Sequence, residues 1–598
     1  MPHPPQPTRA TGIATLLVLA LFFSGCSKEP APVEETALVA ETQRCPDYRA
    51  GGKNLYWGDL HVHTAYSLDA YGYGTVASPA DAYHFAKGNA IDLPDGTAVK
   101  LARPLDFTAV TDHAEWFDLM YVCTHPLFED DEYCRLMNEK SAPATGTEVF
   151  RNYVIPTITL EKPQITPVCE DDPEKCLQAT TNQWRRIQEQ AHEANDACNF
   201  TSFAAFEWSA TPSYSHNHRN VIFANEKVVD EAIDYIRYPD LDEFWRQLDA
   251  RCRPEDGCDA ITIPHNNNMG DGFGFDVETE SERSLQTRTR FERLVEIHQE
   301  KGNSECLSPF GAEDENDCAF ELYLTRLSRP KEPADFGKEE WEQMRRTYVR
   351  SLLLRGLEAY EHSEDHHRNP LQLGIIGSTD NHTATPGHVE EDAWHGSAFG
   401  LGEFERAMLR IDWNPGGLVA VWAEENTRES LFAAMKRREV FGTSGPRIRL
   451  QFSAAPDGEA LPCTEDRRDA RTTVPMGGEF SNASQAPQFR IVAEQDLVPL
   501  ERIEVIKGEW RDGEARETVF DVSPEGGLDD QVCLTWTDPD FDGSAPAFWY
   551  VRVEQEPTLR WSAVMCREEG RCDDYPEADR HIHERAWSSP IWYLPVDP

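Results

Sequence analysis

The sequence predicts an α/β fold followed by a smaller region made mostly of β-strands. From residue 55 to about residue 445, apolar runs alternate with amphipathic helical stretches, an order that favours a parallel barrel or an open parallel sheet. After about residue 446, strand-like runs are separated by Gly, Pro and Asp turns, which predicts an antiparallel β-sandwich. Histidines follow four apolar runs of the first region, and barrel enzymes place catalytic residues at the C-terminal ends of strands.

Seven apolar runs of the first region are predicted strands: Leu55–Leu60, Leu105–Thr111, Ser202–Trp208, Ala260–Pro264, Leu294–Ile297, Leu373–Thr379 and Leu418–Trp422. Ser78 and Pro79 are typical of the cap and first turn of a helix. The predicted helices are Pro79–Lys87, Gln183–Asn195, Leu241–Ala250, Glu339–Leu354 and Arg428–Arg438. Polar segments at 120–180 and 300–338 are expected to be surface loops that roof the site.

The last region contains five predicted strands: Phe489–Glu494, Arg502–Lys507, Thr518–Val522, Val532–Trp536 and Phe548–Glu554. In the last of these, Trp549, Val551 and Val553 alternate with polar or charged residues. A period of two predicts a half-buried strand with one apolar face.

The N-terminus has the features of an export signal. Arg9 precedes an apolar run that ends at Phe23 and is too short to span a bilayer. The following Ser-Gly-Cys26 resembles a bacterial lipobox with Cys26 as the lipidated residue, and an ordinary secretory signal is the alternative. We expect a signal peptide at 1–26, an acidic tether at 27–50, a metal-binding region at 51–445 and a β-rich region at 446–598. The exported protein is then anchored to a bacterial membrane only through its lipid, at the outer membrane facing the periplasm or the cell surface.

The remaining cysteines agree with export. Removing Cys26 from 15 cysteines leaves 14, and ten of these form close pairs in the sequence. Disulfides between such pairs are typical of oxidising compartments, and the chain has no C-x-x-C motif of the zinc-thiolate kind. The close pairs are Cys123/Cys134, Cys169/Cys176, Cys252/Cys258, Cys306/Cys318 and Cys566/Cys572, and Cys463/Cys533 is a further candidate. Cys45 and Cys198 are left over.

The composition is strongly acidic, with 105 acidic residues against 57 basic ones. Nucleic acid is therefore not expected as a partner, because phosphate backbones are bound through Lys and Arg. Most of the charge is expected to be a solvated surface. Bound cations would invert the field locally, so a small anionic substrate remains compatible with this composition. The sequence does not indicate an oligomeric state.

Histidines and carboxylates recur at spacings that suit metal ions. His61 and His63 lie two residues apart on a predicted strand, so both side chains point to one face and can bind one ion. Asp69 follows at a distance that lets it reach a neighbouring ion, and Asp380 and His382 again share one face. The other histidines that follow predicted strands are His113 and His265. Such ligands suit Zn, Mn or Fe, and paired ions generate hydroxide for hydrolysis at neutral pH.

These segments together resemble the polymerase and histidinol phosphatase (PHP) superfamily. The resemblance implies a distorted seven-stranded (β/α) barrel of the PHP type with a site for two or three metal ions. A closer resemblance is to the DUF3604 family, a PHP-like bacterial family of unassigned function, over roughly residues 45–598. It is carried by the segments 56–64 (YWGDLHVHT), 218–223 (HRNVIF), 299–305 (QEKGNSE), 443–447 (TSGPR), 538–541 (DPDF) and 589–593 (SPIWY).

The PHP resemblance implies three sets of metal ligands. The first set is His61, His63, Glu207 and Asp380. In the second set, Glu207 bridges to an ion shared with His265 and His218. The third set is Asp69, His113 and His382. The acids and base expected to be essential for catalysis are Asp69, Glu207, His265 and Asp380. His216 is an alternative to His218, and His298 is expected to be a pocket residue or a packed core histidine.

Neighbours of these motifs are candidates for supporting roles. Arg219, Lys301 and Arg447 are candidate substrate-binding residues for an anionic oxygen, with structural salt bridges as the alternative. The candidates for orienting the metal-binding imidazoles by accepting a second N–H are Asp59, Asp112 and Asn266, which otherwise contact the backbone.

Three functions are compatible with this sequence. The leading hypothesis is an exported, divalent-metal-dependent hydrolase of phosphate mono- or diesters that uses a metal-bridging hydroxide. The same site chemistry permits hydrolysis of an amide, a lactone or a sulfate ester, because fold does not fix function. The third possibility is a surface lipoprotein that binds a ligand without turnover.

Overall fold

The computed structural model describes residues 44–48, 51–125, 132–142, 144–160, 163–314, 317–324, 332–362, 369–456, 461, 463 and 473–595. The chain divides into residues 1–44 and a compact unit formed by residues 45–598, to which all described helices and strands belong. The predicted signal peptide and Cys26 lie outside the described residues, as does most of the tether.

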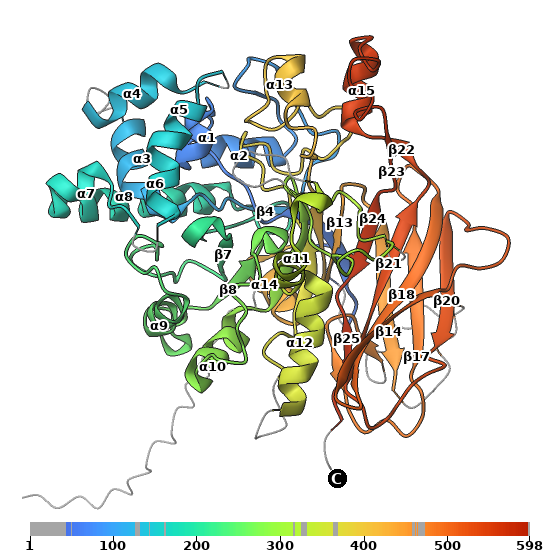
Figure 1. The fold of residues 1–598 in the computed structure, drawn as a ribbon. Coiled ribbons are helices and arrows are strands. Elements are labelled where there is room, and N and C mark those ends of the chain that lie inside the picture. Colours follow the sequence, from blue (N-terminus) through green and yellow to red (C-terminus); the bar gives the residue numbers. More distant parts are fainter. Residues whose placement is uncertain are drawn as a thin grey trace, which may run out of the picture. The chain divides into compact units, whose positions relative to one another are not determined.

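The first region alternates strands and helices, as predicted (Figure 1). Its first half contains β1 (Asn54–Asp59), α1 (Leu68–Gly72), α2 (Pro79–Ala86), β2 (Ile91–Asp92), β3 (Ala98–Val99), β4 (Phe107–Ala109), η1 (Ala114–Trp116), α3 (Phe117–Thr124), α4 (Glu132–Lys140), α5 (Thr147–Val149), η2 (Phe150–Val154), α6 (Ile155–Ile158), α7 (Pro167–Asp171) and α8 (Pro173–Ala194).

The second half of this region contains β5 (Thr201–Phe203), β6 (Ala205–Ala210), η3 (Pro212–Tyr214), β7 (Asn217–Phe223), α9 (Leu241–Arg251), η4 (Pro254–Asp256), β8 (Ala260–Pro264), η5 (Asn267–Met269), α10 (Glu282–Phe291), β9 (Leu294–Gln299), β10 (Gly302–Asn303), η6 (Pro333–Asp335), α11 (Lys338–Arg345), α12 (Val349–His362), β11 (Gly374–Gly377), α13 (Phe404–Met408), β12 (Leu418–Ala423), α14 (Arg428–Lys436) and β13 (Val440–Thr443).

Strand β1 lies at the centre of the pairing. It is parallel to β4 and antiparallel to β12, and β4 is parallel to β5. Gly58 permits the first of these contacts, because a Cβ atom at this position would overlap the ring of Phe107 on β4. Strands β6, β7 and β8 form an antiparallel sheet, whereas β9 is parallel to β11.

Single bridges connect these sheets where the regular ladders stop. They join His113 to Glu207, Thr262 to Glu292, and Val62 to Asn381, all in parallel orientation. The ladders β1–β4, β6–β7–β8 and β9–β11 are therefore linked to one another, and back to the segment after β1, only by isolated bridges. The observed fold is mixed α/β with several sheets rather than one continuous barrel ladder.

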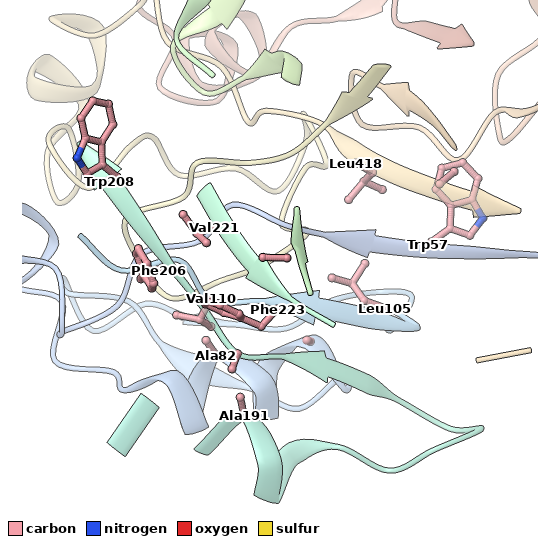
Figure 2. Packing of buried hydrophobic residues seen from close by; sticks show 14 of the residues in the cluster. Trp57, Ala82, Leu105, Val110, Ala191, Phe206, Trp208, Val221, Phe223 and Leu418 are labelled. Atoms are coloured by element: carbon pink, nitrogen blue, oxygen red, sulfur yellow. The ribbon is translucent and has the colours of Figure 1, made fainter. Parts of the chain in front are cut away.

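Helices cover the outer side of β6 and β7 (Figure 2). Phe206 on β6 and Val221 and Phe223 on β7 belong to one buried apolar cluster with Ala82 of α2 and Ala191 of α8. The cap predicted for α2 is present as a capping box, in which the Ser78 backbone N–H donates to the Asp81 carboxylate at 2.7 Å. The buried faces of α2 and α8 therefore pack against β6 and β7, the two strands that carry Glu207 and His218.

The segment 120–180 differs from the sequence expectation. It was expected to be a surface loop, but its described residues contain α4, α5, η2, α6 and α7. Its polar residues favoured a loop, but helix α4 buries Cys134 and Met137 on one side and leaves Arg135, Asn138 and Glu139 exposed. The predicted helix at residues 339–354 is likewise two helices, α11 and α12.

The last region consists of two antiparallel groups of strands that pack face to face. Strands β14, β15, β17 and β20 form one sheet, while β18, β19, β21, β24 and β25 belong to the large sheet that also contains β1. Figure 1 shows these long strands side by side in orange and red. The bounds are β14 (Arg449–Ala455), β15 (Val474–Pro475), β16 (Glu479–Phe480), β17 (Gln488–Glu494), β18 (Leu500–Arg511), β19 (Glu514–Asp521), β20 (Gln531–Thr537), β21 (Ala547–Gln555), β22 (Thr558–Leu559), α15 (Trp561–Glu568), β23 (His581–Ile582), β24 (Arg585–Ser588) and β25 (Ile591–Tyr593).

The large sheet passes through the predicted boundary at residue 445. Strand β13, which precedes this boundary, pairs with β24, which lies far beyond it. The first region and the last region are therefore connected by main-chain hydrogen bonds within one compact unit.

Seven disulfides stabilise the described chain. Every pair predicted from the sequence is present, including Cys463–Cys533. The two left-over cysteines form the seventh, Cys45–Cys198. This cysteine usage fits an oxidising or extracellular compartment. Among the residues that the structure describes, no helix has both the length and the apolar character needed to span a bilayer.

Candidate metal centre

The candidate ligands lie where strands end. His61 and His63 follow β1 directly, and both side chains are fully buried. Asp380 follows β11 and adopts a left-handed backbone conformation with φ of 54°, which Asp tolerates better than most residues. The Asp380 N–H donates to the His61 carbonyl at 2.9 Å, which fixes the ends of the two strands side by side.

Four side chains form the first donor set. His61 Nε2 lies 3.2 Å from Glu207 Oε2 and 3.2 Å from Asp380 Oδ1. His63 Nε2 lies 3.3 Å and 3.1 Å from the same two oxygens, and 3.3 Å from His61 Nε2. Ligands about 2.0 Å from one tetrahedral ion are separated by about 3.3 Å, so these atoms have the spacing of a metal-binding tetrahedron.

The other oxygen of Glu207 faces a second donor set. Glu207 Oε1 lies 2.7 Å from His218 Nδ1 and 3.3 Å from His265 Nε2. Neither ring nitrogen of His265 has a hydrogen-bond partner among the described residues, although the side chain is buried. Buried polar atoms are rarely left unpaired, so a cation at this position would satisfy an otherwise costly arrangement.

A third donor set surrounds Asp69 in the first turn of α1. Asp69 Oδ2 lies 3.3 Å from His113 Nε2 and 3.2 Å from His382 Nε2. The ring of His63 stacks between those of His113 and His382, with centroid distances of 4.4 and 4.2 Å. The nine residues expected to bind metal are thus brought into one contiguous cluster.

Several of these imidazoles also make a second contact, through the ring nitrogen that does not face the other donors. His61 Nδ1 lies 3.1 Å from both oxygens of Glu296 on β9, and His382 Nδ1 lies 2.9 Å from Glu300 Oε1. Hydroxyl groups serve the others: Ser67 contacts His63 Nδ1 at 2.9 Å, Ser209 contacts His113 Nδ1 at 2.6 Å, and Thr211 contacts His218 Nε2 at 2.7 Å. Such contacts would fix which ring nitrogen faces a bound metal ion.

None of these orienting residues was predicted from the sequence. Asp59 and Asp112 accept hydrogen bonds from backbone and hydroxyl groups instead, including the Thr379 and Thr64 hydroxyls. Asn266 Nδ2 lies 3.4 Å from His218 Nδ1, the ring nitrogen that faces Glu207, so its amide does not accept the second N–H of that ring. The sequence pattern does not indicate Glu296, because its contact with His61 depends on the pairing of strands whose residues lie 235 positions apart.

Lys301 carries positive charge into this acidic cluster. Its Nζ atom contacts Asp380 Oδ2 and lies 3.8 Å from Glu300 Oε1. Burial lowers the pKa of Lys301, but Asp380 and Glu300 outweigh that effect and raise the pKa above its ordinary value. Lys301 is therefore cationic at neutral pH.

The carboxylates of the donor sets are ionised despite their burial. Burial raises the pKa of Glu207, but His113 and His265 outweigh it and hold the pKa well below its usual range. The pKa of Asp69 is likewise held well below its usual range, because His113 and His382 outweigh burial. Lys301 is the only Lys or Arg that pairs with these buried acids among the described residues. Divalent cations are the charges that such a carboxylate and imidazole set fits.

The other predicted residues lie away from the donor sets, and for Arg219 the alternative expectation, a structural salt bridge, applies. Arg219 is fully buried and pairs with Glu292 at 2.8 Å, so its guanidinium is engaged away from the cluster. Arg447 donates to the carbonyls of Arg103 and Pro104 and lines a separate cavity. His298 is buried between the rings of Phe320 and Trp587, as expected of a packed core histidine.

A cavity of about 130 Å³ opens onto the donor sets. Its floor contains all three residues of the third donor set, together with Glu207, His218 and Asp380. His216 also lines it, beside His218, but the His218 ring is the one that faces Glu207. Lys301 and Arg410 contribute positive charge, and Arg410 has no ion-pair partner among the described residues.

The matching family covers nearly all of the folded chain. The DUF3604 family, described as a protein of unknown function, matches residues 50–532 and 526–595. The chain belongs to the DUF3604 family. The donor sets and the second contacts described above all lie within the matched residues of this DUF3604 protein.

Two further likenesses are more limited. An uncharacterized protein of Chlamydia pneumoniae is 32% identical over 196 residues, which cover 31% of this chain and 23% of that protein. A solved structure from Bacteroides vulgatus, a two-domain protein containing a predicted PHP-like metal-dependent phosphoesterase, covers 86% of this chain and 94% of its own. Its TM-score is 0.29 and its sequence identity is 11%, so it does not assign an activity to this DUF3604 protein.

Proposed function

We propose that this protein is an exported hydrolase of small phosphate esters that depends on divalent metal ions. The observation that carries this proposal is the division of the Glu207 carboxylate between two donor sets. One oxygen faces His61 and His63, and the other faces His218 and His265. A carboxylate placed in this way would hold two ions, and paired ions, when bound, would supply hydroxide and stabilise charge on the transferred group.

The protein's own residues have clear parts in this proposal. Glu207 and Asp380 contribute carboxylate ligands, and Asp69 does so for a third position. Glu296 and Glu300 keep the ring nitrogens of His61 and His382 directed toward the ions. The set suits Zn, Mn or Fe, with two or three ions bound. The bridged sheets around it form, in this proposal, a distorted (β/α)7 barrel of the PHP type.

The charges at the cavity favour an anionic substrate. Lys301 and Arg410 both line the cavity. The Arg410 guanidinium has no ion pair with any residue that the structure describes, and a guanidinium matches two oxygens of a phosphate. The phosphate ester is therefore preferred over an amide or a lactone, which carry no charge to be recognised. A small molecule is expected rather than nucleic acid, given the acidic composition.

Metal analysis and turnover together test the proposal. Protein made in an oxidising compartment is expected to hold two or three transition-metal ions per chain and to hydrolyse an aryl phosphate. Asp380→Asn should lose metal and at least 100-fold in turnover, while the exposed control Asp242→Asn should retain both. Turnover confined to sulfate esters, lactones or amides would select another hydrolase. Folded protein that binds no added metal would contradict the catalytic assignment and favour ligand binding without turnover.

Export and lipid attachment at Cys26 belong to the same proposal. They rest on the lipobox-like sequence and agree with the seven disulfides. Radioactive palmitate should label the wild-type chain and not a Cys26→Ser variant. Labelling of neither would indicate an ordinary secretory signal.

A further inference from the structure

One side of the cavity is a continuous wall of aromatic rings. Tyr73 and Phe399 have ring centroids 4.3 Å apart, and Phe399 and Trp413 have centroids 4.9 Å apart. Phe150 extends the wall from Tyr73 at 6.5 Å, and Tyr323 extends it from Trp413 at 6.2 Å. All five residues line the cavity, and we call them the aromatic wall.

The aromatic wall is assembled from separate parts of the chain. Tyr73 ends α1, Phe150 begins η2, and Trp413 lies between α13 and β12. Phe399 and Phe150 are only partly buried, so parts of their rings remain accessible. Tyr73, Tyr323 and Trp413 are buried, so the accessible apolar surface of the wall comes from Phe399 and Phe150. Open apolar surface beside a few polar groups is typical of a ligand pocket.

The aromatic wall directly adjoins the donor sets. The ring of Phe399 lies 5.6 Å from that of His382, and Lys301 Nζ lies 5.3 Å from the Trp413 ring. A phosphate held at Lys301 would therefore have its ester oxygen and organic group beside flat apolar surfaces. The cavity therefore has a charged floor that suits a phosphate group and an apolar wall that suits an aryl group, which are the two parts of an aryl phosphate.

We propose that the aromatic wall is a subsite for a flat, apolar organic group, so that the substrates are aryl or similarly planar phosphate monoesters. This inference rests on the proposed phosphoesterase function and names its substrate class. Ring-to-ring contacts contribute enough to favour an aryl group over a methyl group by about tenfold. Phe399, in contact with both His382 and Trp413, makes the central contribution.

Binding of two non-hydrolysable probes tests the subsite without relying on turnover. Calorimetry on the metal-loaded protein should show that phenylphosphonate binds about tenfold more tightly than methylphosphonate. Phe399→Leu keeps an apolar side chain but removes the ring, and it should bring the two affinities to within about threefold of each other. Phe310→Ala, a substitution of a partly exposed ring elsewhere, is the matched control and should keep the preference.

The outcomes separate this inference from the proposed function. Equal binding of the two phosphonates by the wild type would overturn the aryl subsite and leave the phosphoesterase proposal standing. A preference that persists in Phe399→Leu would also overturn it. If neither phosphonate nor inorganic phosphate binds, the proposed function fails and the subsite fails with it. Metal content measured on each variant shows whether the donor sets remain intact.

Discussion

At the scale of single residues, we expect the carboxylates that contact the outer ring nitrogens of the candidate ligands to influence how tightly a metal ion binds. Glu296 contacts His61 Nδ1 with both oxygens, from a fully buried position on β9. Replacing it by Gln keeps the shape but removes the carboxylate that faces the ring nitrogen, and should weaken metal affinity about 10- to 100-fold. Competition with a chelator measures the change, and exposed Glu313→Gln is the control. Unchanged affinity would mean that Glu296 does not orient the ring.

His298 makes folding stability depend on pH. Burial lowers its pKa to about 4, so the folded protein holds this ring neutral. The unfolded chain binds a proton below its ordinary value of 6.5, and stability is therefore lost as pH falls from about 6.5 to about 4. Urea unfolding should show a loss between pH 7 and pH 4.5 that is about 2 kcal/mol smaller in His298→Gln than in the wild type. Equal losses would contradict a neutral buried ring.

The candidate metal ligands could be predicted from the sequence, but the residues that orient them could not. His61, His63 and Asp380 follow apolar runs at spacings that are visible in the chain, and the structure brings them together. Glu296 lies 235 residues from His61, so only strand pairing reveals their contact. Arg219 shows the opposite case, because its place in a motif did not reveal that Glu292 already neutralises it.

At the scale of elements, the segment 299–305 connects the site to the last region. Its first part carries Glu300 and Lys301 at the donor sets, and its end carries Glu305. Glu305 accepts hydrogen bonds from Arg350 at 2.6 Å, Tyr550 at 2.6 Å and Trp587 at 2.8 Å. Tyr550 belongs to β21 and Trp587 to β24, so the C-terminal strands hold the segment that bears Lys301.

Removal of the Glu305 charge should therefore be strongly destabilising. Arg350 would remain buried beside it with a weakened set of acceptors, and losing one partner of a buried pair costs about 3–5 kcal/mol. Glu517→Gln is the matched control, because it pairs with the same Arg350 but is 27% exposed and should cost less than about 1 kcal/mol. Urea unfolding compares Glu305→Gln with this control. Similar losses in the two variants would show that Glu305 is not the anchor.

Strand β21 shows where prediction from pattern stops. The alternation around Val551 correctly predicts a strand, but it predicts one exposed face, and every residue of β21 is buried. The polar side chains Tyr550 and Arg552 turn toward Glu305 and are satisfied there. A polar or charged residue in a strand indicates an exposed face only when it has no buried partner. Here the partner, Glu305, lies 245 residues from Tyr550 in the sequence, so the strand pattern alone does not reveal it. The same long-range pairing connects β13 to β24 across the predicted boundary at residue 445.

Over the whole molecule, the disulfides constrain the chain unequally. Cys45–Cys198 encloses 153 residues of sequence separation, whereas Cys169–Cys176 encloses seven. Each disulfide closes a loop in the unfolded chain and so reduces the conformational entropy of the unfolded state. In the chain-entropy account, the stabilisation grows with the logarithm of the loop, to about 5 kcal/mol for the long loop and about 2.5 kcal/mol for the short one.

The double variant Cys45→Ala/Cys198→Ala should therefore lose about twice as much free energy of unfolding as Cys169→Ala/Cys176→Ala. The long link also joins the start of the folded chain to the turn before β5, where the Cys198 N–H donates to the Asn426 carbonyl at 2.8 Å. Urea unfolding of both variants under oxidising conditions measures the two losses. Equal losses would show that native contacts, and not the constraint on the unfolded chain, determine what each disulfide contributes.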